Sequence, residues 1–129
     1  MVLCLRECRH FVAGDWKGDA MGLIYLASAY SHPDPEVRLM RYWAAVKKAA
    51  ELMKAGENIF SPIAHTHEIG LILGDSVDHS FWMAQDKEIL RRCDKLLVLL
   101  LPGWSESKGV AEEIEFARSI GIPVEYETA

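Results

Sequence analysis

The chain has 129 residues, of which 50% are hydrophobic, and it carries 19 acidic and 14 basic residues for a formal net charge of −5. This length suits one domain with a substantial core. The negative charge, without any basic block, argues against binding to a nucleic acid polymer, and no apolar run reaches the length of a membrane span.

The first twenty residues fit the pattern of the rest of the chain poorly, and a second methionine, Met21, directly precedes the first predicted strand. We therefore expect one domain over residues 21–129, preceded by an extension over residues 1–20 that is disordered or produced by an upstream start codon. The opening residues are too charged for a secretory signal. Because three cysteines leave one unpaired in any scheme, we expect reduced thiols in a cytoplasmic protein.

The next segments alternate between strand and helix. Gly22–Ala27 is a short apolar run followed by turn-prone residues, which is typical of a strand. Asp34 can cap a helix and Pro35 can occupy its first position, so a helix is expected from there to about Ala55. One apolar stripe, at steps of three and four residues, is expected to be buried: Leu39, Trp43, Val46, Ala50 and Met53.

The pattern continues to the end of the chain. Asn58–Ile63 is the second predicted strand, and a polar loop rich in histidine follows it. A helix over about Ser80–Arg92 leads to a strand over Lys95–Leu101. The last helix covers about Val110–Ile120, and Ile122–Tyr126 is the fourth strand.

This order predicts a small doubly wound α/β fold, flavodoxin-like or Rossmann-like, with a parallel sheet of about four to five strands and helices on both faces. Ligands bind outside the carboxyl ends of the strands in such sheets. Three polar loops are expected to meet there: Ser28–Asp34, Ser61–His79 and Pro102–Gly109. We expect the segment from His65 to His79 to form a mobile lid.

Two acids lie on apolar helix faces. At about 100° per residue, the neighbours of Glu113 three and four positions away are apolar or glycine, and Asp86 has apolar neighbours on the preceding helix. An isolated buried carboxylate costs several kcal/mol unless it is paired or protonated. Either acid alone is explained by a structural role, as a helix cap or an arginine partner. Two such acids near the strand ends favour a functional site.

The loop before Glu113 supports this interpretation. Ser105, Ser107 and Gly109 lead into a helix N-terminus, where small residues and free N–H groups can bind an anion, although many such loops are plain turns and caps. His65, His67 and Glu68 form an H-x-H-E pattern that could bind a metal. Without a third ligand such histidines are usually solvated or hydrogen-bonded, so we expect no metal and a ligand contact from His65.

Several segments resemble the nucleoside 2-deoxyribosyltransferase superfamily, which includes deoxynucleoside-monophosphate N-glycosidases and further bacterial and phage proteins. The resemblance covers most of residues 21–124 and rests on IYLASAY, QDKEIL, CDKLLVLL and SKGVAEEIEFA with GIPV after it. It includes a GW-x-x-S-x-G-V-x-x-E pattern formed by Gly103, Trp104, Ser107, Gly109, Val110 and Glu113. The fold of the superfamily is the α/β fold predicted above.

The resemblance implies a role for each matching residue. Glu113 matches the nucleophile that attacks the anomeric carbon of the sugar, Asp86 the acid that assists proton transfer, and Tyr25 the residue that positions the nucleophile. Ser107 matches a sugar- or phosphate-contacting position that is serine in the nucleotide hydrolases, which favours a phosphorylated ligand. Further ligand contacts are expected from Gly109, Ser28, His65 and Trp104.

We therefore expect an N-glycosidase or deoxyribosyltransferase that uses no metal or other cofactor. A nucleotide-binding sensor with the same pocket, or an assembly subunit with a vestigial one, is the alternative. The expected partner is a small nucleoside or nucleotide rather than a nucleic acid polymer or a membrane. Apolar aromatic side chains on a small sheet domain favour a homodimer or homotetramer.

Overall fold

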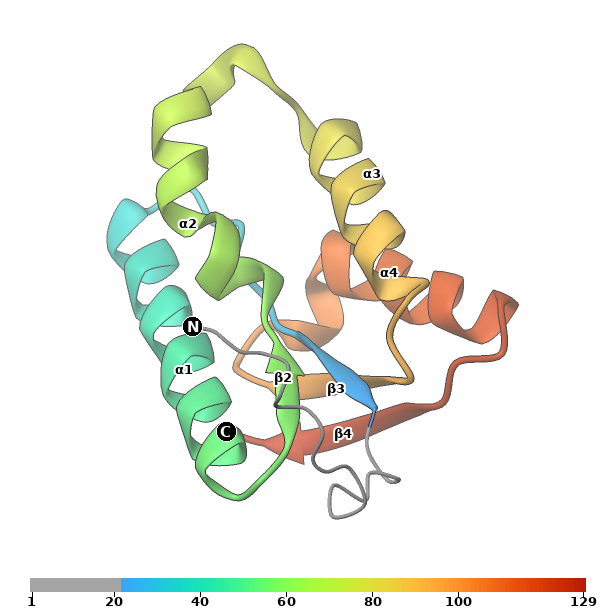
Figure 1. Cartoon of the computed structure of the whole chain (residues 1–129). Helices are drawn as coiled ribbons and strands as arrows, with labels where there is room; N and C mark the ends of the chain where they lie inside the picture. The colour runs from blue at the N-terminus through green and yellow to red at the C-terminus, as the bar shows by residue number, and fades with distance from the viewer. Residues whose placement is uncertain (1–21) are drawn as a thin grey trace, which may run out of the picture.

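The structure of the protein is a computed structural model that describes residues 22–129 (Figure 1). The extension expected over residues 1–20 lies outside the described residues, and so do Cys4 and Cys8. The remaining cysteine, Cys93, is a free thiol buried in the core. None of the helices in the described range is long and apolar enough to cross a membrane.

Four parallel strands form one sheet in the order β2-β1-β3-β4. Their bounds are Leu23–Ala27 for β1, Asn58–Phe60 for β2, Lys95–Leu100 for β3 and Val124–Thr128 for β4. The chain runs from β1 to β2 on one side and then returns past β1 to β3, so the direction of winding reverses between β1 and β3. The predicted doubly wound α/β fold is thus confirmed, and a ligand crevice is expected at this reversal.

The two central strands present alternate side chains to the two faces of the sheet, as the strand period requires. One face packs against α1, which spans Pro35–Lys54 and contributes the buried Ala49. The other face packs against α3 (His79–Leu90) and α4 (Lys108–Ser119), which lie side by side in Figure 1. Tyr25 of β1 points to this second face, which brings its side chain to the helices that carry the two acids.

The buried face of α1 is not the one predicted. Ala45 and Ala49 are the buried residues of this helix and Ala49 packs against the sheet, whereas Trp43 is 58% exposed. The other residues of the predicted stripe are exposed or half-buried: Leu39, Val46, Ala50 and Met53. Small alanine side chains let the helix approach the sheet closely, and the larger side chains remain outside. The homo-oligomer expected from exposed aromatic side chains stays a prediction.

The segment after β2 is a helix, so the prediction of a loop there was wrong. Helix α2 spans Pro62–Leu73 and packs beside α1. The Ser61 hydroxyl accepts a hydrogen bond from the Ala64 N–H at 3.1 Å, and Pro62 occupies the first helical position. A short 3₁₀ turn, η4 (Gly74–Ser76), then leads to α3. The outer apolar side chains of α2 are exposed, including Leu71 and Ile72.

Candidate active site

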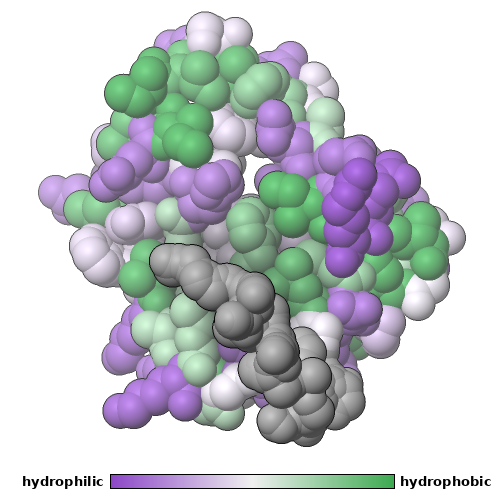
Figure 2. Space-filling view, in the orientation of Figure 1, coloured by the Kyte–Doolittle hydropathy of each residue, from purple (hydrophilic) through white to green (hydrophobic). Residues whose placement is uncertain are grey.

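A cavity of about 870 Å³ opens at the carboxyl ends of β1 and β3. Its walls come from the loop after β1, from the first two turns of α1, from α2 and α3, and from the segment after β3 with the start of α4. Figure 2 shows the surface hollowed beneath the connection between α2 and α3. The cavity has the size of a small-molecule site and lies at the point where the winding of the sheet reverses.

Two carboxyl groups meet in this cavity. Glu113, from the second turn of α4, is 4% exposed and accepts a hydrogen bond from the Tyr25 hydroxyl, with 2.6 Å between Tyr25 O and Glu113 Oε2. Asp86, from α3, is half-buried and lines the same cavity, near enough to Glu113 for each carboxyl group to shift the pKa of the other. Because three different elements of the fold supply these side chains, their convergence depends on the tertiary structure. No arginine pairs with Asp86 among the described residues.

The surroundings keep the two acids from ionising together. Burial raises the pKa of Glu113 to about 8; the Tyr25 hydrogen bond acts against this rise, and the charge of Asp86 adds to it. Burial also raises the pKa of Asp86 to about 6, against the opposing effects of Glu113 and His79. The pKa of Tyr25 is raised far above its ordinary value by burial and by the carboxylates, so its hydroxyl remains a donor. Near neutral pH the pair therefore shares one proton.

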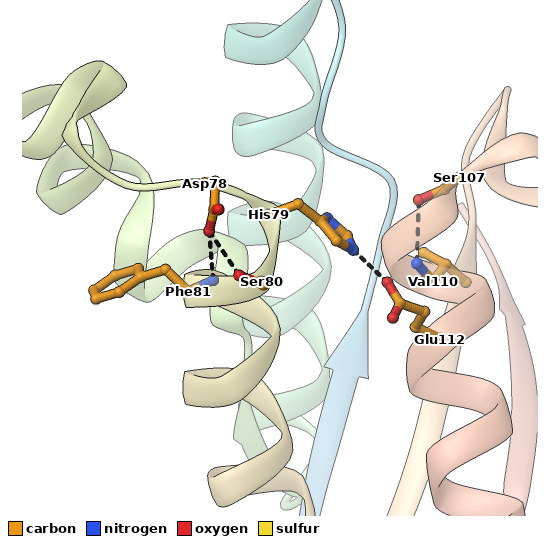
Figure 3. Close-up of polar contacts among 7 residues, drawn as sticks. All are labelled: Asp78, His79, Ser80, Phe81, Ser107, Val110 and Glu112. Carbon is orange, nitrogen blue, oxygen red and sulfur yellow. Dashed lines mark hydrogen bonds and ion pairs between the residues drawn. The ribbon is translucent and has the colours of Figure 1, made fainter.

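The helices that carry the acids are capped and tied together (Figure 3). The Ser107 hydroxyl accepts from the Val110 N–H at 3.2 Å and begins α4. His79, at the start of α3, is hydrogen-bonded to Glu112 of α4. This contact lowers the pKa of Glu112. The pair bridges the two helices beside the cavity, and sequence reasoning assigned neither residue a role.

The structure places most of the predicted site residues at the cavity. Five of them line it: Ser28, Asp86, Ser107, Gly109 and Glu113. Two others lie elsewhere. His65 is exposed on α2 and packs against Phe60, with 5.6 Å between ring centroids, and Trp104 packs against Tyr126 at 5.7 Å. Their placement gives no support to the expected ligand contacts.

The H-x-H pattern does not form a paired site. On a helix, residues two apart point in different directions, so His65 and His67 diverge. His67 is hydrogen-bonded through Nδ1 to the Tyr30 hydroxyl at 2.7 Å, and its ring stacks on Tyr42 with 4.1 Å between centroids. No group of three His, Cys, Asp or Glu residues within residues 22–129 is arranged to hold a metal ion.

Sequence reasoning missed two cationic residues of α1, Arg38 and Arg41, which line the cavity. The Arg41 guanidinium donates to the Ser31 carbonyl at 2.9 Å and to the Pro102 carbonyl at 3.4 Å, so it links the loops that follow β1 and β3. The available signal was a pair of arginines three residues apart. They lie in the first two turns of the helix that follows a central strand. Their position at the carboxyl end of the sheet distinguishes them from surface charges.

Comparison with known proteins agrees with this fold. The family described as "Domain of unknown function (DUF1937)" matches residues 22–128. A solved structure of a 2-deoxyribosyltransferase from the psychrotolerant bacterium Bacillus psychrosaccharolyticus is similar, with a TM-score of 0.59 and 21% sequence identity over 82% of this chain and 72% of that chain. At this identity the similarity shows the fold. Among curated proteins, none matches the sequence.

Proposed function

We propose that this chain, which belongs to the DUF1937 family, is an enzyme that breaks the N-glycosidic bond of a nucleoside or nucleotide and transfers the sugar to water or to a second base. The observation that carries the proposal is the buried Glu113 carboxyl, held by Tyr25 and facing Asp86 in a cavity at the reversal of the sheet. The likeness of the fold to a 2-deoxyribosyltransferase supports chemistry at the same kind of bond.

The proposed reaction has two steps. Cleavage leaves positive charge on the anomeric carbon, which a nearby carboxylate can capture. In the first step an oxygen of Glu113 bonds to the anomeric carbon, the bond from that carbon to the base nitrogen breaks with its electron pair going to the nitrogen, and Asp86 gives the base a proton. In the second step water or another base attacks the same carbon, Glu113 leaves as a carboxylate, and Asp86 accepts the proton released.

The first step needs the shared proton on Asp86. The reactive arrangement has an ionised Glu113 beside a protonated Asp86, whereas burial raises the pKa of both carboxyl groups. The Tyr25 hydroxyl donates to Glu113 and favours its ionised form. Positive charge that develops on the sugar favours the same form, so the substrate itself promotes the proton transfer.

The test is release of free base from a panel of ribonucleosides, deoxyribonucleosides and their 5′-monophosphates, followed by chromatography. We expect release by the native protein and none by Glu113→Gln. Glu115→Gln is the matched control, because Glu115 is exposed on the same helix and its replacement should leave the rate unchanged. Base release by Glu113→Gln at the native rate would refute the assignment.

A nucleotide-binding sensor without catalysis is the second candidate. The observation that favours it is the burial of Glu113, which raises the pKa of its carboxyl group and disfavours the ionised form that a nucleophile needs. A sensor predicts that nucleotides bind while neither the native protein nor Glu113→Gln releases base. The same panel, measured for binding and for release, therefore separates the two functions.

A further inference from the structure

We propose that His79 and Glu112 are positioning residues: the contact between them holds the start of α3 against α4 and thereby keeps Asp86 beside Glu113. The pair acts through Asp86 and not on the ligand. The consequence for catalysis rests on the proposed function, whereas the positioning of the two helices rests on the contact itself.

The side chains involved form two successive pairs along the contact between the helices. His79 precedes Asp86 by seven residues, which is about two helical turns, so both lie on the face of α3 that is turned toward α4. Glu112 directly precedes Glu113 in α4. A bridge at His79 therefore fixes the same face of α3 that presents Asp86 to the cavity, two turns nearer the start of the helix.

The start of α3 has few other ties to the rest of the fold. Its end is anchored in the core by the fully buried Leu90, whereas the connection from α2 enters the helix at the end away from the sheet (Figure 1). That connection is exposed from Gly74 to Ser76. Within residues 22–129, the contact between His79 and Glu112 is the only ion pair that joins α3 to α4. Loss of this contact should therefore loosen the first turns of α3.

Helix formation alone does not explain a histidine at this position. The helix is already capped by Asp78, whose carboxylate accepts a hydrogen bond from the Phe81 N–H at 3.0 Å. A cationic side chain at the first position of a helix is opposed by the helix dipole, which favours negative charge there. Figure 3 shows the imidazole of His79 turned away from its own helix toward Glu112. The acid on the neighbouring helix is thus the better reason for the histidine.

The charges of the bridge also reach the two acids of the cavity. Burial raises the pKa of Asp86, and the positive charge of His79 acts against this rise after the effect of Glu113. Burial is likewise the main cause that raises the pKa of Glu113, and the charge of Glu112 adds to it. Because His79 supplies a countercharge, the bridge limits the repulsion that Glu112 would otherwise exert on an ionised Glu113.

A double-mutant cycle tests whether His79 acts through Glu112. Base release is measured for His79→Ala, for Glu112→Ala and for the double variant. We expect each single variant to lose about 10- to 100-fold in kcat with little change in KM, since a misplaced acid slows proton transfer without weakening binding. The double variant should lose no more than either single variant. Losses that add in the double variant, or a native rate in His79→Ala, overturn the proposal.

Two further variants guard against a general loss of structure. His79→Gln keeps a hydrogen-bond donor for Glu112 without the positive charge and should retain part of the rate. Arg92→Ala breaks an exposed ion pair with Glu88 on the same helix, outside the cavity, and should leave the rate unchanged. An equal loss in Arg92→Ala would show that any disturbance of α3 has the same effect, which overturns a specific role for His79.

A second kind of substrate separates the position of the acid from damage to the cavity. The base of an N7-methylated purine nucleoside already carries a positive charge, so it leaves as a neutral molecule without receiving a proton. The position of Asp86 matters less for this nucleoside, and His79→Ala should release its base at within about threefold of the native rate. A loss as large as that for ordinary nucleosides overturns the proposal.

Hydrogen exchange of the backbone amides reports the positioning without any turnover. We expect the amides of residues 83–86 to exchange about 3- to 10-fold faster in His79→Ala and in Glu112→Ala than in the native protein, with no further increase in the double variant. This result supports the positioning even where the native protein releases no base and the proposed function fails. Exchange at the native rate in both single variants overturns the positioning, even where base is released.

Discussion

Replacing Glu113 with glutamine is expected to abolish base release and, at the same time, to stabilise the protein in alkaline solution. The amide has the shape of the protonated carboxyl group. Its oxygen can accept from the Tyr25 hydroxyl, and its NH₂ group can donate to Asp86. The variant therefore keeps the hydrogen bonds of protonated Glu113 but cannot ionise in the buried site.

The size of the effect follows from the raised pKa of Glu113, about 8 in the folded protein against an ordinary value of 4.5. A carboxyl group whose pKa rises on folding stabilises the folded state fully below its unfolded pKa, and this stabilisation is lost as the pH rises through the folded pKa. Each unit corresponds to about 1.4 kcal/mol. Because Asp86 and Glu113 share the effect, we expect Glu113→Gln to gain about 1–3 kcal/mol near about pH 9.

Thermal unfolding followed by circular dichroism between about pH 4 and about pH 9 measures this gain, which should appear as a rise of about 3–12 °C in Tm at the alkaline end. Near about pH 4 the variant and the native protein should unfold together, since Glu113 is then largely protonated in both the folded and the unfolded state. The matched control is again Glu115→Gln, from the exposed side of the same helix. If Glu113→Gln unfolds at or below the native temperature throughout the alkaline range, or if the control gains as much, burial of an ionisable pair is not the cause.

Two further predictions concern the neighbours of Glu113. Tyr25→Phe removes the donor that favours ionised Glu113, so the pH of half-maximal base release should move upward by about 1–2 units. The control is Tyr126→Phe, at an exposed tyrosine, which should leave the pH–rate profile unmoved. An equally unmoved profile for Tyr25→Phe would contradict this role. Ser107→Ala should lower the free energy of unfolding by about 1 kcal/mol in denaturant titrations. Ser107→Asp should keep the native free energy of unfolding, because aspartate is also a good helix cap. Equal destabilisation by both variants would show that Ser107 is not acting as a cap.

The sheet and the acid pair could be predicted from the sequence for the same reason. Strands covered on both faces are short apolar runs bounded by turn residues, and β3 offers no other interpretation. A single carboxylate in an apolar helical stripe is equally conspicuous, as Glu113 and Asp86 show. The strands follow directly from burial on both faces, whereas each acid interrupts an apolar stripe, and the free-energy cost of burying it points to a reason for its position.

The helices were harder because their sequences allow more than one arrangement. Helix α1 has apolar residues on two adjoining faces, and periodicity alone does not say that two alanines are buried while Trp43 stays outside. The prediction placed Pro62 within the strand Asn58–Ile63, although after Ser61 it equally suits the first turn of a helix. The arginines were missed because charges three residues apart on a helix are usually solvated.

The acid pair sets a requirement on any ligand that reacts in this cavity. Burial raises the pKa of both Asp86 and Glu113, so the pair resists full ionisation, and a ligand that brings a second negative charge near the acids would raise the pKa of Glu113 further. Under the proposed function, the positive charge that develops on the sugar has the opposite effect. It favours an ionised Glu113, to which the Tyr25 hydroxyl donates, and leaves the shared proton on Asp86, where the leaving base needs it.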